Sequence, residues 1–119
     1  MNDKRIQIFA EISPQAIVDN CNILRSFLPL GCKMCVAVKC NAYGHDIEIC
    51  LEAFEKAKIE MLSVALIDEA RQIRQLGWSK PLLLLGSEFS IYQGRQKEDI
   101  AEWIIENELR ITAVNDYDL

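Results

Sequence analysis

Three side chains able to take part in chemistry lie within one short stretch of the chain, residues 34–45. A continuous apolar run, Met-Cys-Val-Ala-Val, ends at Lys39, and a polar turn that contains Tyr43 and His45 follows it. A lysine amine forms Schiff bases with carbonyl compounds, a tyrosine hydroxyl hydrogen-bonds to phosphate groups, and histidine exchanges protons near neutral pH. The stretch therefore predicts a buried strand that delivers one amine to a site.

The position of Lys39 favours a role in chemistry. The run before it lacks apolar–polar alternation, which is typical of a parallel strand covered on both faces. Active sites of α/β folds lie at the carboxyl ends of such strands, where loops converge and helix N-termini face ligands. Position alone also fits a lysine that only carries its charge out to water. His45 follows at an expected helix start, and we interpret it as structural.

The elements around this stretch alternate between helix and strand. Apolar residues at helical spacing predict a helix from Ser13-Pro14 to near Pro29, and further helices over residues 46–54, 68–77 and 97–108. Short apolar runs predict strands at residues 34–38, 61–65, 81–86 and 109–114. The positions expected to face inward are Ile17, Cys21, Leu24, Leu28, Ile47, Cys50, Leu51, Phe54, Ala70, Ile73, Leu76, Ile100 and Ile104. This alternation predicts an α/β fold of parallel βα units with right-handed crossovers.

Composition limits the class of protein. The chain has 119 residues, of which 50% are hydrophobic, so it has the size and apolar content of one domain. A net charge of −5 argues against nucleic acid or an anionic membrane as the partner. The sequence has no apolar stretch of the roughly 20 residues that span a membrane, and its start lacks a signal-peptide apolar region. We therefore expect a cytoplasmic protein.

The cysteines offer a competing kind of site. Five of them are scattered through the chain, an odd number that fits reduced, mostly buried thiols better than a disulfide framework. Cys32 and Cys35 form a Cys-x-x-Cys pair, which can serve redox chemistry or bind metal. This pair precedes its strand instead of opening a helix, and no second close pair accompanies it. We therefore expect no metal site here.

The run from residue 38 to residue 45, Val-Lys-Cys-Asn-Ala-Tyr-Gly-His, resembles the lysine motif of the alanine racemases. Further matching segments are Phe9 to Ile12, Asn20, residues 63–65, Glu69-Ala70, Leu76-Gly77 and residues 81–86, so the resemblance covers nearly the whole chain. Three positions depart from the usual pattern, Phe9, Cys40 and Asp46, and none removes a group that the family's chemistry needs. The sequence is thus identified as a member of this family.

The resemblance implies a fold, a cofactor and a reaction. Residues 1–119 correspond to the first half of the N-terminal (β/α)8 TIM barrel, with the C-terminal β domain of the family absent. Lys39 forms the Schiff base with pyridoxal 5'-phosphate, and Tyr43 contacts its phosphate; a partly buried ring with a solvated hydroxyl is the other interpretation of Tyr43. The reaction interconverts L-alanine and D-alanine, supplies D-alanine for cell walls, and takes place in a homodimer.

Several alternatives stay open. Inverting a carbon centre requires a second acid/base on the opposite face, which the family takes from the other subunit's C-terminal domain, so we expect this chain alone to racemise negligibly. The phosphate site of such barrels is built by the loops after the seventh and eighth strands, so we also expect this chain alone to bind the cofactor poorly. A non-catalytic cofactor-binding or remnant module is one alternative, and racemisation of another amino acid is a second. Leu84 and Leu85 could line the cofactor ring, although a role in the barrel core is the simpler expectation.

Overall fold

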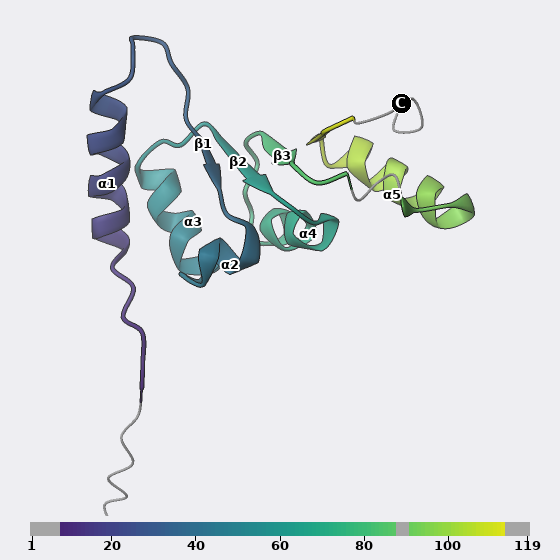
Figure 1. Ribbon diagram of the computed structural model, residues 1–119, viewed down its shortest axis with the longest axis horizontal. Helices are drawn as coiled ribbons and strands as arrows, with labels where there is room; N and C mark the ends of the chain where they lie inside the picture. Colours follow the sequence, from purple (N-terminus) through teal and green to yellow (C-terminus); the bar gives the residue numbers. More distant parts are fainter. Residues whose placement is uncertain (1–7, 88–90, 114–119) are drawn as a thin grey trace, which may run out of the picture.

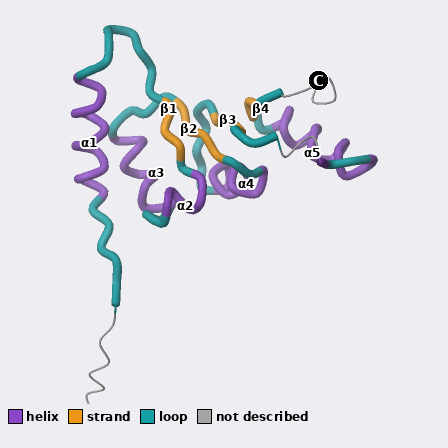
Figure 2. Tube along the Cα trace, in the orientation of Figure 1, coloured by secondary structure: helices purple, strands orange, loops and turns teal. Residues whose placement is uncertain are grey.

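Parallel strands in chain order form the centre of the molecule. The computed structural model describes residues 8–87 and 91–113, and within them the sheet has the order β1-β2-β3-β4 with every neighbouring pair parallel. The strands are β1 (Cys35–Ala37), β2 (Met61–Val64), β3 (Leu82–Leu84) and β4 (Leu109–Ile111), and the helices are α1 (Pro14–Ser26), α2 (Lys39–Tyr43), α3 (Ile47–Lys56), α4 (Ile67–Gln75) and α5 (Gly94–Glu106). Figure 2 shows the strands side by side between the helices. The predicted α/β fold is confirmed.

The two faces of the sheet differ in cover. The pairing places Val36, Leu62, Leu82 and Leu109 across from one another in one row, and the last three are buried in the core. Residues one position away point to the other face, where Ser63 is buried but Met61 and Leu83 are only half-buried and Cys35 and Arg110 are exposed. Helix α4 packs against β2 and β3, and α5 packs against β4. The sheet therefore has one face in the core and one open face.

The exposure of β1 corrects the expectation that this strand is covered on both sides. Among the described strands it lies at an edge, with β2 as its one neighbour, and Cys35 at its start is exposed. The continuous apolar run predicts burial on both faces, but the described chain covers only one. In the part of the chain that the structure describes, β1 and β4 form the two edges of the sheet, and each edge has backbone hydrogen-bonding groups that no described strand pairs.

Helix α1 begins as predicted but packs less than predicted. The Ser13 hydroxyl accepts a hydrogen bond from the Ala16 backbone N–H at 3.2 Å and caps the helix. The helix packs against α3 and stands at the edge of the molecule (Figure 1). Cys21 is buried, but Leu24 and Leu28 are 58% and 36% exposed, so the prediction that both face the core is wrong. The helical period identifies an apolar face without revealing how much of it a neighbour covers.

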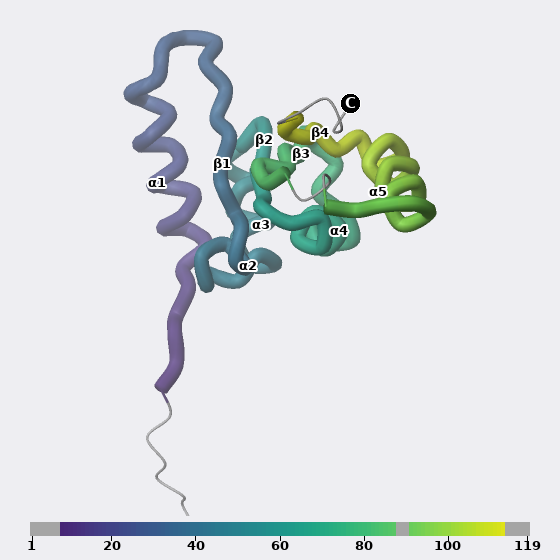
Figure 3. Tube along the Cα trace, turned by 45° about the vertical axis from the view of Figure 1, so that its right-hand side comes forward, coloured from purple at the N-terminus to yellow at the C-terminus, as the bar shows by residue number. Residues whose placement is uncertain are grey.

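The remaining helices agree closely with the expected faces. All four apolar residues expected to face inward on α3 are buried, as are Ala70 and Ile73 on α4 and Ile100 and Ile104 on α5. Leu76 is the exception at 38% exposure, because α4 ends at Gln75 and Leu76 is its cap. Gly77 follows with φ +97°, a conformation that favours glycine after a helix. Figure 3 shows α5 at the far end of the molecule from α1.

Candidate active site

Lys39 stands where β1 ends and a tight turn begins. The Val38 backbone N–H donates to the Ser63 carbonyl at 2.8 Å, so the contact between β1 and β2 continues one residue past the strand. Val38 itself is buried in the core. Lys39 follows, half-buried, and no described residue hydrogen-bonds or ion-pairs with its side chain. Its amine therefore lies at the carboxyl end of a parallel strand without a bonded partner in the described structure.

The turn after Lys39 has a left-handed backbone. Cys40, Asn41 and Ala42 have φ of 54–55° and ψ of 47–50°, and Tyr43 has φ 55°. Bonds from the Ala42 N–H to the Val38 carbonyl and from the Gly44 N–H to the Cys40 carbonyl close it as a short helical turn. L-residues in this conformation cost roughly 1–2 kcal/mol each. Such strain persists only where the surroundings enforce it, and it concentrates at functional sites.

Local bonds hold the end of this turn. The Asn41 side-chain oxygen accepts from the Ile47 N–H at 2.9 Å, and Asp46 accepts from the Glu48 and Ile49 N–H groups, so both cap α3. Nδ1 of His45 lies 2.9 Å from the Ala42 carbonyl oxygen. The carbonyl can only accept, which selects the tautomer with hydrogen on Nδ1. His45 thus braces the turn in this structure.

Glu69 fastens the beginning of the turn to the next βα unit. Its Oε1 accepts from the Cys40 N–H at 2.7 Å, and its Oε2 accepts from the Ala65 and Leu66 N–H groups at 2.9 and 3.0 Å. Glu69 lies in the first turn of α4, and this helix lies beside α2 (Figure 1). One carboxylate therefore joins the residue after Lys39 to the carboxyl end of β2.

The other predicted site residues divide into exposed and buried groups. Tyr43 is 58% exposed and lies one helical turn after Lys39, since about four residues make a turn. Leu84 is fully buried on the core face of β3, as the simpler expectation required. Leu85 is 46% exposed at the carboxyl end of β3 and does not belong to the core. Lys39, Tyr43 and Leu85 thus remain accessible at the carboxyl edge of the sheet.

The cysteines depart from expectation in their burial. All five thiols are unpaired, but only Cys21 and Cys50 are buried, whereas Cys32, Cys35 and Cys40 are exposed. Burial raises the pKa of the Cys21 and Cys50 thiols. The prediction of mostly buried thiols is therefore wrong for three positions, all of which lie before or after the edge strand or at its start. The described residues contain no group of three or more side chains arranged to hold a metal ion.

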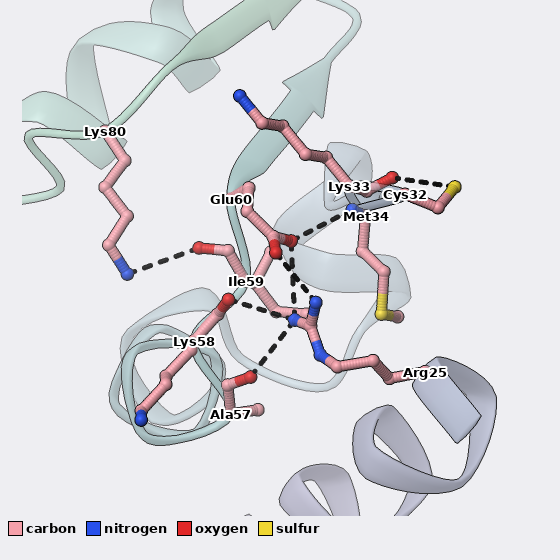
Figure 4. Close-up of polar contacts among 9 residues, drawn as sticks. All are labelled: Arg25, Cys32, Lys33, Met34, Ala57, Lys58, Ile59, Glu60 and Lys80. Carbon is pink, nitrogen blue, oxygen red and sulfur yellow. Dashed lines mark hydrogen bonds and ion pairs between the residues drawn. The ribbon is translucent and has the colours of Figure 1, made fainter. Parts of the chain in front are cut away.

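The opposite end of the sheet carries a charged network. Arg25, in the last turn of α1, donates to the Glu60 carboxylate at 2.7 Å and to the Lys58 carbonyl at 2.9 Å (Figure 4). Glu60 also accepts from the Met34 N–H at 2.9 Å. These two interactions, with Arg25 the stronger, lower the pKa of Glu60 to about 2. The network joins the end of α1 to the starts of β1 and β2.

Comparison with known proteins gives the family. Residues 12–118 match the family model described as the N-terminal domain of alanine racemase. An alanine racemase of Geobacillus stearothermophilus is 41% identical over 88 residues, and one of Acinetobacter baumannii is 42% identical over 83 residues. These alignments cover 73% and 70% of this chain and 22% of each relative. The chain belongs to the alanine racemase N-terminal domain family, and it spans under a quarter of the length of these relatives.

Solved structures agree with this assignment. The alanine racemase from E.faecalis superposes with a TM-score of 0.76 at 28% identity, over 90% of this chain and 27% of that one. The enzyme of Clostridium difficile 630 gives 0.74 at 30% identity, over 92% and 27%. A histidine racemase of Leuconostoc mesenteroides gives 0.66 at 24% identity, which supports the fold alone. The described sheet matches part of the barrel domain of these amino-acid racemases.

No helix in the described ranges is long and apolar enough to cross a membrane.

Proposed function

We propose that this chain supplies the cofactor lysine of an alanine racemase dependent on pyridoxal 5'-phosphate. The observation that carries the proposal is the amine of Lys39, half-buried at the carboxyl end of β1 and without a bonded partner among the described residues, in a chain of this family. Residues 1–119 would form part of the N-terminal barrel domain, and the other strands and the second acid/base would come from sequence outside these residues.

The residues at this edge fit the cofactor. Lys39 offers a primary amine for covalent attachment to an aldehyde, and Tyr43 offers an exposed hydroxyl one turn later for a phosphate. No described residue competes for the Lys39 amine. When bound, the cofactor's pyridine ring would withdraw electrons from the amino acid and make its Cα proton acidic.

The chemistry assigned to this chain is limited to one side of the substrate. Lys39 Nζ takes the proton from Cα or returns it there, always from the face on which the lysine lies. The left-handed turn fixes the backbone of Lys39 relative to that of Tyr43, so both side chains start from set positions at the same edge of the sheet. Exchange of L- and D-alanine needs a second proton carrier on the opposite face.

The wider context is part of the same proposal. We place the complete enzyme in the cytoplasm as a homodimer that supplies D-alanine for cell-wall synthesis, as the family membership supports. Alanine is the favoured substrate because the relatives from Geobacillus stearothermophilus and Acinetobacter baumannii are alanine racemases. The histidine racemase of Leuconostoc mesenteroides has the same fold, so this scaffold is compatible with a different amino acid.

Selective labelling tests the role of Lys39. The chain is mixed with pyridoxal phosphate, reduced with borohydride, digested and analysed by mass spectrometry. We expect more label on Lys39 than on any other lysine, together with an absorption band that Lys39→Ala abolishes. Lys58→Ala is the matched control, because Lys58 is an exposed lysine at the opposite end of the sheet, and it should keep the band.

An assay of alanine racemisation accompanies the labelling. We expect negligible turnover by the chain alone, because in this proposal the described residues supply one proton carrier, Lys39, and inversion needs a second on the opposite face. Labelling spread evenly over the lysines would overturn the assignment of Lys39. Selective label without turnover fits both a half-site and a non-catalytic binding module; turnover after the remainder of the enzyme is supplied separates them. Robust turnover by the chain alone would refute the requirement for residues outside it.

A further inference from the structure

The carboxylate of Glu69 makes more bonds than a helix cap requires. In a capping arrangement, a glutamate in the first helical turn accepts from the backbone N–H at the start of its own helix, as Glu69 does from Leu66. Its other oxygen instead reaches Cys40, which is 29 residues away in sequence and directly follows Lys39. At 2.7 Å, this N–H bond to a carboxylate is among the short, strong hydrogen bonds.

The hydrogen bond between Cys40 and Glu69 lies where the backbone, after β1, changes to the left-handed conformation. Cys40 is the first left-handed residue after β1, and three more non-glycine residues follow in the same conformation. The later part of the turn has its own bonds through Asn41 and His45. The Cys40 N–H has no acceptor among the described residues other than Glu69. The Val38 N–H bond to the Ser63 carbonyl and the Ala42 N–H bond to the Val38 carbonyl lie on either side of this point, and the Glu69 bond restrains the Cys40 peptide between them.

We propose that Glu69 is the positioning residue for Lys39: by holding the Cys40 N–H against the end of β2, it sets where the lysine amine stands relative to the neighbouring strand. This inference rests on the proposed function, because it concerns the amine assigned to the cofactor. Glu69 does not touch the reacting atoms. It acts through the backbone of Cys40, and its other bonds, to Ala65 and Leu66, anchor that backbone to β2.

Asp68 provides a matched control on the same helix turn. Its side chain is 87% exposed and pairs with Arg71 at 3.1 Å, and no hydrogen bond or ion pair joins it to the described residues 39–45. Asp68→Ala therefore removes the same charge from the same helix start and leaves the Cys40 bond in place. Glu69→Gln keeps one carbonyl oxygen as an acceptor but loses the second, so it should fall between the native chain and Glu69→Ala.

Two measurements on the full chain test the proposal. Amide hydrogen exchange, which needs no cofactor, should be roughly tenfold faster at Cys40 in Glu69→Ala, because a charge-assisted hydrogen bond is lost. Reductive labelling with pyridoxal phosphate should show the ratio of label on Lys39 to label on Lys58 falling by a similar factor. Asp68→Ala should change neither value, and Glu69→Gln should restore part of both.

The outcomes separate the two proposals. If label is spread evenly over the lysines of the native chain, the proposed function is overturned. A positioning role of Glu69 toward this cofactor is then overturned as well, whether or not amide exchange at Cys40 changes. Selective native labelling that Glu69→Ala leaves unchanged would show that Glu69 is only a structural cap. The same conclusion follows if Asp68→Ala lowers the ratio equally. If Glu69→Ala unfolds the chain, the comparison is made with Glu69→Gln, and an unchanged labelling ratio there overturns the proposal.

Discussion

The two ends of the parallel sheet use their polar groups in different ways. At the amino end, charged side chains bond one another: Arg25 holds Glu60, and Lys80 pairs with Glu55 at 2.6 Å. At the carboxyl end, the carboxylate of Glu69 binds backbone N–H groups, and the amine of Lys39 has no bonded partner among the described residues. The amino end pairs Arg25 and Lys80 with carboxylates of the fold, whereas at the carboxyl end four successive non-glycine residues have positive φ and the Lys39 amine has no bonded partner among the described residues.

This difference separates stability from function in space. Barrel folds place catalysis at the carboxyl ends of strands and stabilising contacts at the amino ends. The described sheet already shows this division. At the amino end the Arg25–Glu60 network joins a helix end to the starts of two strands, and at the carboxyl end the Glu69 bonds restrain the turn after Lys39. Changes at the amino end should therefore alter the free energy of unfolding without changing the selectivity of Lys39 labelling. Changes at the carboxyl end should alter that selectivity more than they alter the free energy of unfolding.

Loss of the Glu60 charge should lower stability more than the other substitutions at the two ends of the sheet. Glu60→Gln weakens the bonds to Arg25 and Met34, and we expect the free energy of unfolding at pH 7 to fall by roughly 1–2 kcal/mol. Because folding lowers the pKa of Glu60 from 4.5 to about 2, its contribution is complete above pH 4.5 and disappears as the pH falls to about 2. Urea unfolding at several pH values measures both effects.

The control for Glu60 is Glu52, which pairs with Lys56 on the exposed face of α3. Glu52→Gln should change stability far less at pH 7. The difference in stability between the native chain and Glu60→Gln should shrink steadily in acid. A difference that stays constant down to pH 2 would mean that the carboxylate charge does not stabilise this end of the sheet. Labelling of Lys39 should be the same in both variants.

Asn41 tests the carboxyl end, with a smaller expected effect on stability. Asn41→Ala removes the acceptor for the Ile47 N–H at the start of α3 and also a residue type that tolerates the left-handed conformation. We expect a loss of about 1 kcal/mol in urea unfolding. Asn41→Asp retains an acceptor oxygen and should remain near the native value. Equal stability of Asn41→Ala and the native chain would show that the turn holds without this bond.

Most of the fold is predictable from the sequence because amphipathic period and apolar strand runs are local properties. The apolar positions of α3 lie in the core as expected, and Lys39 follows a strand as the sequence predicts, although its role in chemistry stays a prediction. The exposure of Leu24 and of the edge strand β1 is not predictable in the same way, because a pattern does not reveal which neighbours are present. Local signals alone cannot show how much cover each face receives.

The left-handed turn escapes prediction for a different physical reason. Asn41 and Gly44 tolerate positive φ, but Cys40, Ala42 and Tyr43 are residue types that avoid it, so local preference argues against the observed backbone. The bond that fixes the start of the turn comes from Glu69, which lies in the next βα unit. Leu66 stands at the helix start where a serine or threonine would have signalled a capping box, so the sequence hides the role of Glu69 as well.

The pair of Lys80 and Glu55 should show the smallest effect. Glu55→Gln removes a partly exposed ion pair, but Lys80 still donates to the Ile59 carbonyl at 3.2 Å and still lies 4.8 Å from the centre of the Trp78 ring. We expect a change of at most about 0.5 kcal/mol in urea unfolding, and less at about 1 M salt, where screening weakens exposed pairs. A larger loss in the free energy of unfolding that persists in salt would mean that this pair stabilises the amino end as strongly as Arg25 and Glu60 do.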